Sequence, residues 1–271
     1  GASLVALEGP LTRVQARCAA VIVAAVFYAS VTWLRANEWS DPLRLARSEA
    51  MKRPDSSAAQ FDYAQALLLT SIRTHESAPA NAALQVLDRA RHLRGASTHF
   101  EQSMITLLGE SGYAAPPDVW ASLIDKLKRS APDTNAIHAF ARLNHCFMAN
   151  QCKPSDLPHL RAAYDAALSH MPTSEGLLSV HAEYAWHVEN DRARAEQDFR
   201  EALRQHPNDI AAQQNLIIVL IHEGKKDEAE TMIEAIEARN RFGMLDGFIK
   251  PMRAALDSVM HETPAQTPVP Q

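Results

Sequence analysis

The sequence predicts an all-α protein in which a solenoid of helical pairs follows one transmembrane helix. A stretch between residues 176 and 240 aligns with itself at a shift of 34 residues, which places Ala195 on Ala229 and Phe199 on Ile233. A fixed period of this size, with small and large apolar residues in register, is typical of a helix-turn-helix repeat. Only nine of 271 residues are glycine and helix-favouring residues are abundant, and no strand-like alternation interrupts them, so helix is expected throughout.

The register of the two copies resembles the tetratricopeptide repeat (TPR). In the first copy the family's small, aromatic and closing-proline positions are occupied, in chain order, by Ala195, Phe199, Ala202, Leu203 and Pro207. In the second copy Arg241 stands where the closing proline is expected, so we interpret it as the last full repeat. The resemblance implies a stack whose first helices line a curved inner surface.

A more degenerate form of the same register extends upstream. Small residues recur at family positions, as at Ala64 and Ala167, and Asp41-Pro42 gives a helix start with an N-cap and a proline in the first turn. We therefore predict a solenoid of about five helical pairs over residues 41–240 and a capping helix over 242–261. The proline-rich tail at 262–271 lacks a hydrophobic pattern and is predicted to be disordered.

The transmembrane helix is predicted over residues 14–36. Its centre is a charge-free run of 17 residues between Arg17 and Arg35, and Tyr28, Trp33 and Trp39 cluster toward its C-terminal side, as in an interfacial aromatic belt. A buried core helix and a cleaved signal peptide are the alternatives. We interpret residues 1–13 as an N-terminal lead, or as the end of a preceding membrane region.

Two cysteines bear on the cellular location. Cys146 and Cys152 flank a helix end marked by Asn150-Gln151 and Lys153-Pro154, so the chain can fold back and bring them together in a disulfide. The alternative is two unrelated cysteines, one of them buried as a small apolar residue. A disulfide implies an oxidising compartment, and we expect a bacterial inner membrane with the repeats in the periplasm. The basic residues that follow the membrane run, counted alone, would place the repeats in the cytoplasm.

Motifs for catalysis or ligand chemistry are missing from the sequence. The segment GESGY that begins at Gly109 does not fit the G-x-S-x-G nucleophile pattern. His181 and His187 are six residues apart in one predicted helix, so they cannot share a face. The net charge of −5 without a basic patch argues against nucleic acid as a partner. We expect no catalytic site, metal or cofactor, and hence no enzyme activity from this chain alone.

The expected binding surface is the concave groove lined by the first helices. The groove positions that the TPR resemblance transfers to this chain are Phe61 and Gln65, Tyr184 and His187, and Gln214 and Ile218. Each of these can equally be a packing residue or part of a solvated face. The mixed aromatic, amide and aliphatic lining suits an extended peptide or a glycan, and it lacks the basic cluster that grips acidic termini.

The junction after the membrane run carries a second resemblance. Arg35, Trp39 and Asp41-Pro42-Leu43, followed by a helix that ends at Pro54, resemble bacterial polytopic membrane proteins similar to protein O-mannosyltransferases that carry TPRs. This resemblance implies a non-catalytic C-terminal region of a larger protein in a glycan-transfer machinery. Two functions are therefore expected: a membrane-tethered scaffold that binds a protein, or an accessory region of a glycosyltransferase or glycan polymerase. A self-contained soluble enzyme has almost no support.

Overall fold

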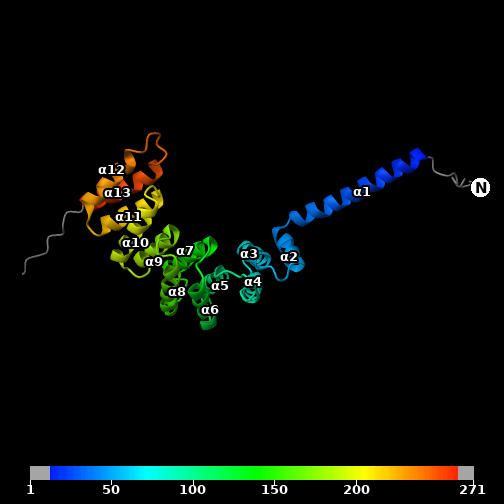
Figure 1. Cartoon of the computed structure of the whole chain (residues 1–271), viewed down its shortest axis with the longest axis horizontal. Helices are drawn as coiled ribbons and strands as arrows, with labels where there is room; N and C mark the ends of the chain where they lie inside the picture. Colours follow the sequence, from blue (N-terminus) through cyan, green and yellow to red (C-terminus); the bar gives the residue numbers. More distant parts are fainter. Residues whose placement is uncertain (1–12, 262–271) are drawn as a thin grey trace, which may run out of the picture. The chain divides into compact units, whose positions relative to one another are not determined.

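The structure, a computed structural model, describes residues 13–261 and confirms the all-α prediction. It contains thirteen α-helices and one short 3₁₀ turn, and no strand occurs within the described range (Figure 1). The predicted lead at 1–13, except its last residue, and the predicted tail at 262–271 lie outside the described residues. The chain forms two compact units, residues 1–86 and 87–271, and the division falls within α4 (Ser77–Ala90).

The first unit contains α1 (Arg13–Trp39), α2 (Pro42–Lys52) and α3 (Ser57–Thr74). The start of α2 is capped as predicted, because Asp41 Oδ1 accepts hydrogen bonds from the backbone N–H groups of Leu43 and Arg44 at 3.0 and 3.4 Å. α2 packs on α3, where small residues such as Ala50 and Ala64 are buried. These small side chains let the two helices approach closely.

Helix α1 is long and apolar enough to cross a membrane by length and composition. The qualifying stretch is Gln15–Asn37, with a mean hydropathy of 1.7, and none of it is buried within the structure. A core helix would bury its apolar side chains, so this alternative does not fit the described part of the chain. Exposed apolar and aromatic residues such as Phe27 and Trp33 are expected where lipid covers the helix.

The second unit is a stack of helical pairs, which confirms the solenoid prediction. After α4 its helices are α5 (His99–Glu110), α6 (Pro117–Arg129), α7 (Thr134–Met148), α8 (Leu157–His170), α9 (Glu175–His187), α10 (Arg192–Gln205), α11 (Ile210–His222), α12 (Lys226–Glu237) and α13 (Asp246–His261). The first helices α5, α7 and α9 pack in sequence, while α6 packs on α8 (Figure 1). Each pair thus contacts its neighbours along the stack, as in a repeat protein.

The positions that repeat every 34 residues lie in the core of this stack. The aligned residues are all buried at 1% exposure or less: Ala195, Phe199 and Ala202 on α10, and Ala229, Ile233 and Ile236 on α12. Five of them, all except Ala202, belong to one apolar cluster with residues of α9, α11 and α13. Burial of the same positions in successive pairs explains why the sequence repeats there.

Left-handed residues end the first helices of three pairs. Asn150, Asn190 and Gly224 follow α7, α9 and α11 with φ values of 55°, 56° and 78°. Asparagine and glycine tolerate this conformation, and it lets the chain reverse toward the second helix. The reversal is closed by backbone hydrogen bonds, for example from Lys225 N–H to the Leu220 carbonyl at 2.9 Å.

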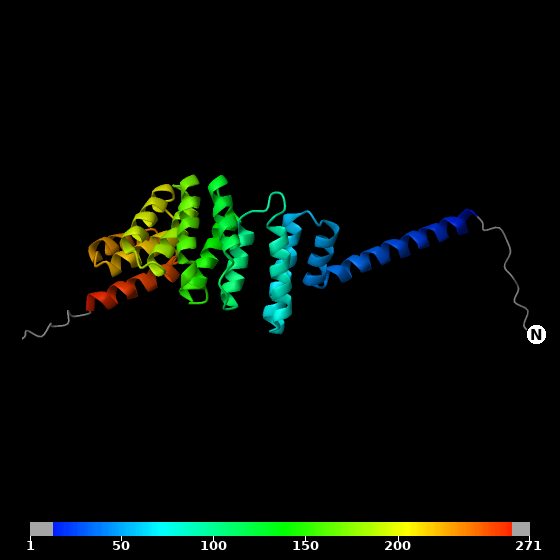
Figure 2. The same cartoon turned by 90° about the horizontal axis from the view of Figure 1, so that it is seen from below.

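Helix α13 covers the end of the stack, where it packs against α11 and α12 (Figure 2). Ile249, Met252 and Leu256 bury its apolar side. The helix begins at Asp246, four residues after the predicted start at 242, because the Asn240 side chain holds a turn in between. Asn240 Oδ1 accepts a hydrogen bond from Leu245 N–H at 2.9 Å, and Asn240 Nδ2 donates to Asp246 Oδ1 at 2.6 Å.

Candidate functional site

The first helices of the last two pairs present one partly exposed face. Half-exposed or exposed residues recur every three or four positions on α9 and on α11, so each helix carries a single open stripe. We call these two stripes together the α9–α11 face; it consists of Val180, Glu183, Trp186, His187, Gln214, Asn215, Ile218 and His222. Two side-chain contacts between the helices, described next, hold the stripes together.

The centre of the α9–α11 face is a carboxylate. Asn215 Nδ2 on α11 donates a long hydrogen bond of 3.5 Å to Glu183 Oε1 on α9. No ion pair to Glu183 occurs among the described residues. Burial raises the pKa of the Glu183 carboxyl, and the hydrogen bond from Asn215 opposes part of that shift. The carboxylate is therefore partly desolvated without a positive partner.

Aromatic rings lie at the C-terminal end of the face. Trp186 is half-buried against the apolar cluster, with its ring centroid 4.3 Å from that of His187 and 5.7 Å from that of His222. Burial lowers the pKa of His187, and the nearby His222 lowers it further. The imidazole of His187 is accordingly disposed to be neutral, so this end of the face offers flat rings rather than a fixed positive charge.

Three of the predicted groove residues lie on the α9–α11 face, and one prediction is wrong. His187 is exposed, and Gln214 and Ile218 are half-buried. Tyr184 is fully buried; its ring stacks on Tyr164 with centroids 4.9 Å apart, and its hydroxyl donates to Glu189 Oε1 at 2.7 Å. It is a core residue because one helical position turns it by about 100° away from the open stripe.

Phe61 and Gln65, the remaining predicted groove residues, lie on α3 of the first unit. Phe61 is half-buried and Gln65 is exposed. Their role in binding stays a prediction.

Sequence reasoning missed Val180, Glu183, Trp186, Asn215 and His222. A signal for them was present, because Glu183 and Trp186 are three residues apart and flank the buried Tyr184. A helical stripe drawn through the mixed polar and aromatic positions, instead of through the family's groove register, would have included them.

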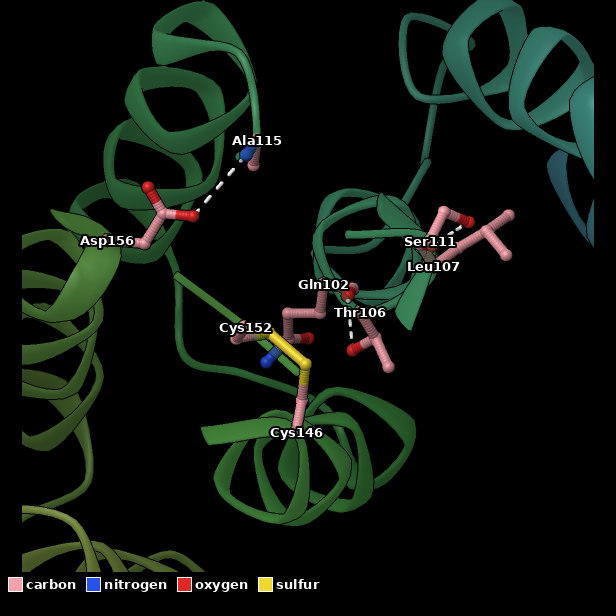
Figure 3. Close-up of a disulfide and its surroundings, with 8 residues drawn as sticks. All are labelled: Gln102, Thr106, Leu107, Ser111, Ala115, Cys146, Cys152 and Asp156. Carbon is pink, nitrogen blue, oxygen red and sulfur yellow. Dashed lines mark hydrogen bonds between the residues drawn. A yellow bond between two sulfur atoms is a disulfide. The ribbon is translucent and has the colours of Figure 1, made fainter. Parts of the chain in front are cut away.

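A buried disulfide lies at the end of α7 (Figure 3). Cys146 and Cys152 are joined with an Sγ–Sγ distance of 2.13 Å and a Cα–Cα distance of 5.2 Å. The left-handed Asn150 turns the chain back, and Cys152 N–H donates to the Cys146 carbonyl at 3.1 Å. The cysteines thus meet because this turn is not helical.

The following turn is tied to the preceding pair. The 3₁₀ turn η1 (Pro154–Asp156) ends in a buried aspartate whose Oδ2 accepts a hydrogen bond from Ala115 N–H at 3.3 Å (Figure 3). The disulfide and Asp156 therefore both stabilise the connection between α7 and α8 where it contacts the α5–α6 pair.

Two acid–base pairs with buried carboxylates belong to the core. His181 Nδ1 and Asp198 Oδ2 are 2.6 Å apart, and Lys126 Nζ lies 2.8 Å from Glu101 Oε1. His181 and Asp198 are 7% and 3% exposed, and Glu101 is fully buried. Because neither pair opens onto the α9–α11 face, we assign both to packing between helices.

A comparison with protein families supports the repeat interpretation. Residues 189–242, which include α10, α11 and α12, match the sequence model of the family described as tetratricopeptide repeat. No curated protein matches the chain. The family match and the helical architecture together support the TPR assignment. The resemblance of the membrane junction to O-mannosyltransferase-like proteins, and with it the glycan-transfer hypothesis, stays a prediction.

Proposed function

We propose that this chain is a membrane-tethered TPR scaffold that binds a segment of a partner protein on the α9–α11 face. The observation that carries the proposal is the open stripe on α11, because it lies inside the segment that matches the TPR family. Repeat stacks of this kind use the surface formed by their first helices for binding.

The composition of the face favours a peptide. Ile218 and Val180 offer apolar surface, while the side-chain amides of Gln214 and Asn215 can both donate to and accept from a peptide backbone. A folded surface would require a broader apolar area than two helical stripes provide. A segment of chain laid along the groove suits these groups better.

Site-directed photo-crosslinking tests the binding face. A photoreactive phenylalanine analogue at Ile218 of the full chain, in membranes of the cells that make it, is expected to form a covalent adduct with a partner protein. The matched control is the same analogue at Glu230, which is exposed on α12 and lies outside the face. Adducts at position 230 without adducts at position 218 would contradict the proposal.

We further propose that α1 is the membrane anchor and that the repeats lie on the oxidising side, the periplasm of a bacterium. The apolar stretch of α1 and the cysteine pair support this arrangement. Alkaline phosphatase fused after the last residue is then expected to be active. Replacing Val23 and Val26 with arginine should release the chain from alkali-washed membranes. An inactive fusion on a chain that stays in the membrane would show that the repeats lie on the opposite, cytoplasmic side.

A further inference from the structure

We propose that the partner segment presents a lysine or arginine side chain to Glu183, so that the α9–α11 face recognises a basic peptide. This inference rests on the proposed function, since it names the chemistry of the partner that the same face binds. Four observations carry it: the isolation of Glu183, the pairing of comparable glutamates, the scarcity of cations on the face, and the neighbouring Trp186.

Glu183 is isolated from positive charge within the described structure. Its carboxylate accepts a hydrogen bond from the side-chain amide of Asn215 at 3.5 Å, which is weak by its length. A half-buried carboxylate loses hydration, and a neutral amide offsets that loss only in part. A cation that arrives from a partner would provide the missing compensation.

Comparable glutamates in the same repeats are paired. The other partly buried glutamates from residue 175 to residue 237 each form an ion pair with a basic side chain: Glu175 with His206, Glu189 with Arg161, Glu196 with Lys225 and Arg200, Glu201 with Arg204, Glu223 with Lys225, and Glu237 with Arg253. The fold therefore supplies a partner for its partly buried glutamates, and Glu183 differs because it lies on the open face.

Cations from the neighbouring helices do not compensate Glu183. On α7, the next helix in the stack, Arg142 Nη2 instead donates to Ser103 Oγ on α5 at 3.4 Å. His187 has its pKa lowered by burial and by His222, which disfavours its charged form. The face thus carries a negative group without a fixed positive group beside it, so an acidic peptide is disfavoured and a basic one is favoured.

Trp186 adds a second feature that suits a basic side chain. It follows Glu183 by three positions, so the two lie on the same side of α9 about one turn apart. Its ring is partly exposed, and its buried side packs against the apolar core. A lysine or arginine whose head group reaches Glu183 can lay its aliphatic stem across this ring, where a cation–π contact adds attraction.

Selection from a phage-displayed library of random peptides on the full chain in detergent micelles tests the inference. Wild-type protein is expected to select peptides enriched in lysine and arginine. Glu183→Gln, which keeps the size of the side chain, should lower the affinity for the selected peptides about tenfold or more, because a charge-assisted hydrogen bond is lost. Glu183→Lys should shift the selection toward aspartate and glutamate. The matched control is Glu201→Gln on α10, where selection should not change.

The outcomes separate this inference from the proposed function. Peptides that lose binding with Ile218→Asp but are not enriched in basic residues, and tolerate Glu183→Gln, would overturn the basic-peptide inference and leave the binding face standing. Peptides indifferent to both substitutions, or the absence of any selected peptide, would overturn the binding face as well. Far-UV circular dichroism of each variant confirms that the helices persist.

Discussion

A β-carbon added to Gly109 would lie 2.6 Å from Sγ of Cys152. It would also lie 2.7 Å from Sγ of Cys146, so the end of α5 presses directly on the disulfide. Gly109 is therefore required by packing between two pairs of the stack, and not by backbone conformation. The contact joins the α5–α6 pair to the one disulfide in the described part of the chain.

Replacing Gly109 with alanine is expected to destabilise the second unit by about 1–3 kcal/mol, the usual cost of overpacking a closed site. Urea unfolding of the purified chain, followed by circular dichroism, measures the change. Gly247→Ala on α13 is the matched control, because a β-carbon there meets no atom within 4 Å. That control should be neutral or stabilising by about 0.5 kcal/mol. Equal effects of the two substitutions would show that the disulfide contact has no energetic role.

Removing the disulfide by Cys146→Ser with Cys152→Ser is expected to lower the free energy of unfolding by about 2 kcal/mol, since the bridge closes a short loop. In this double-serine variant Gly109→Ala should lower the free energy of unfolding by less than it does in the wild type, because a hydroxyl oxygen is smaller than a bonded sulfur. Before any substitution, thiol labelling without reductant of the chain unfolded in SDS, which makes every cysteine accessible, should modify Cys18, which is free, and leave the other two cysteines unmodified. Labelling of all three would contradict the disulfide.

The helical repeats could be predicted from the sequence because their core positions recur at a fixed spacing. Ala195 and Phe199 are informative at the sequence level since their side chains contact the helices of their own pair and the adjacent one. Local contacts of this kind leave a periodic pattern. Long-range contacts do not, and so the segment around Gly109 could only be rejected as a nucleophile motif. Its actual role depends on a turn more than forty residues downstream.

The proposed binding face was harder to predict than the core. An aromatic residue at a family groove position, such as Tyr184, can either face the groove or point into the core. Here the hydroxyl of Tyr184 has an internal acceptor in Glu189 at 2.7 Å, so the ring can be buried without an unsatisfied polar group. The adjacent Glu183 then takes the open position. On α9, one residue of register thus separates the predicted Tyr184 from Glu183, which lies on the proposed binding face.

The ion pair between the buried Glu101 and the partly exposed Lys126 gives a prediction about the α5–α6 interface. Lys126→Met is expected to destabilise the unit by about 3–5 kcal/mol, because it leaves the fully buried Glu101 carboxylate without its cation. Adding Glu101→Gln to this variant should recover part of the loss, as the uncompensated charge is then removed. The matched control is Arg129→Met, whose ion pair with Asp125 is exposed and should contribute less than about 1 kcal/mol. Similar losses of unfolding free energy for Lys126→Met and Arg129→Met would refute the buried-charge argument.

The last prediction concerns acid stability and Glu196 on α10. Burial alone would raise its pKa, but hydrogen bonds from Lys225 and Arg200 outweigh burial and hold the pKa at about 2. Lys225 Nζ lies 2.5 Å from Glu196 Oε2, and Arg200 Nη2 lies 2.7 Å from Oε1. Because the folded-state pKa is below the ordinary value of 4.5, the carboxylate stabilises the fold above about pH 4.5. That contribution is lost progressively as the pH falls toward about 2.

Glu196→Gln should therefore lower the free energy of unfolding at neutral pH by about 1–2 kcal/mol, a value reduced from the full pKa shift because both cations are partly solvated. The difference should shrink as the pH falls below about 4.5, and the variant and the wild type should converge near about pH 2, where the carboxylate of the folded wild type becomes protonated. Urea unfolding at a series of pH values measures both quantities. A difference that stays constant from neutral pH to below about pH 3 would mean that Glu196 acts through packing and not through its charge.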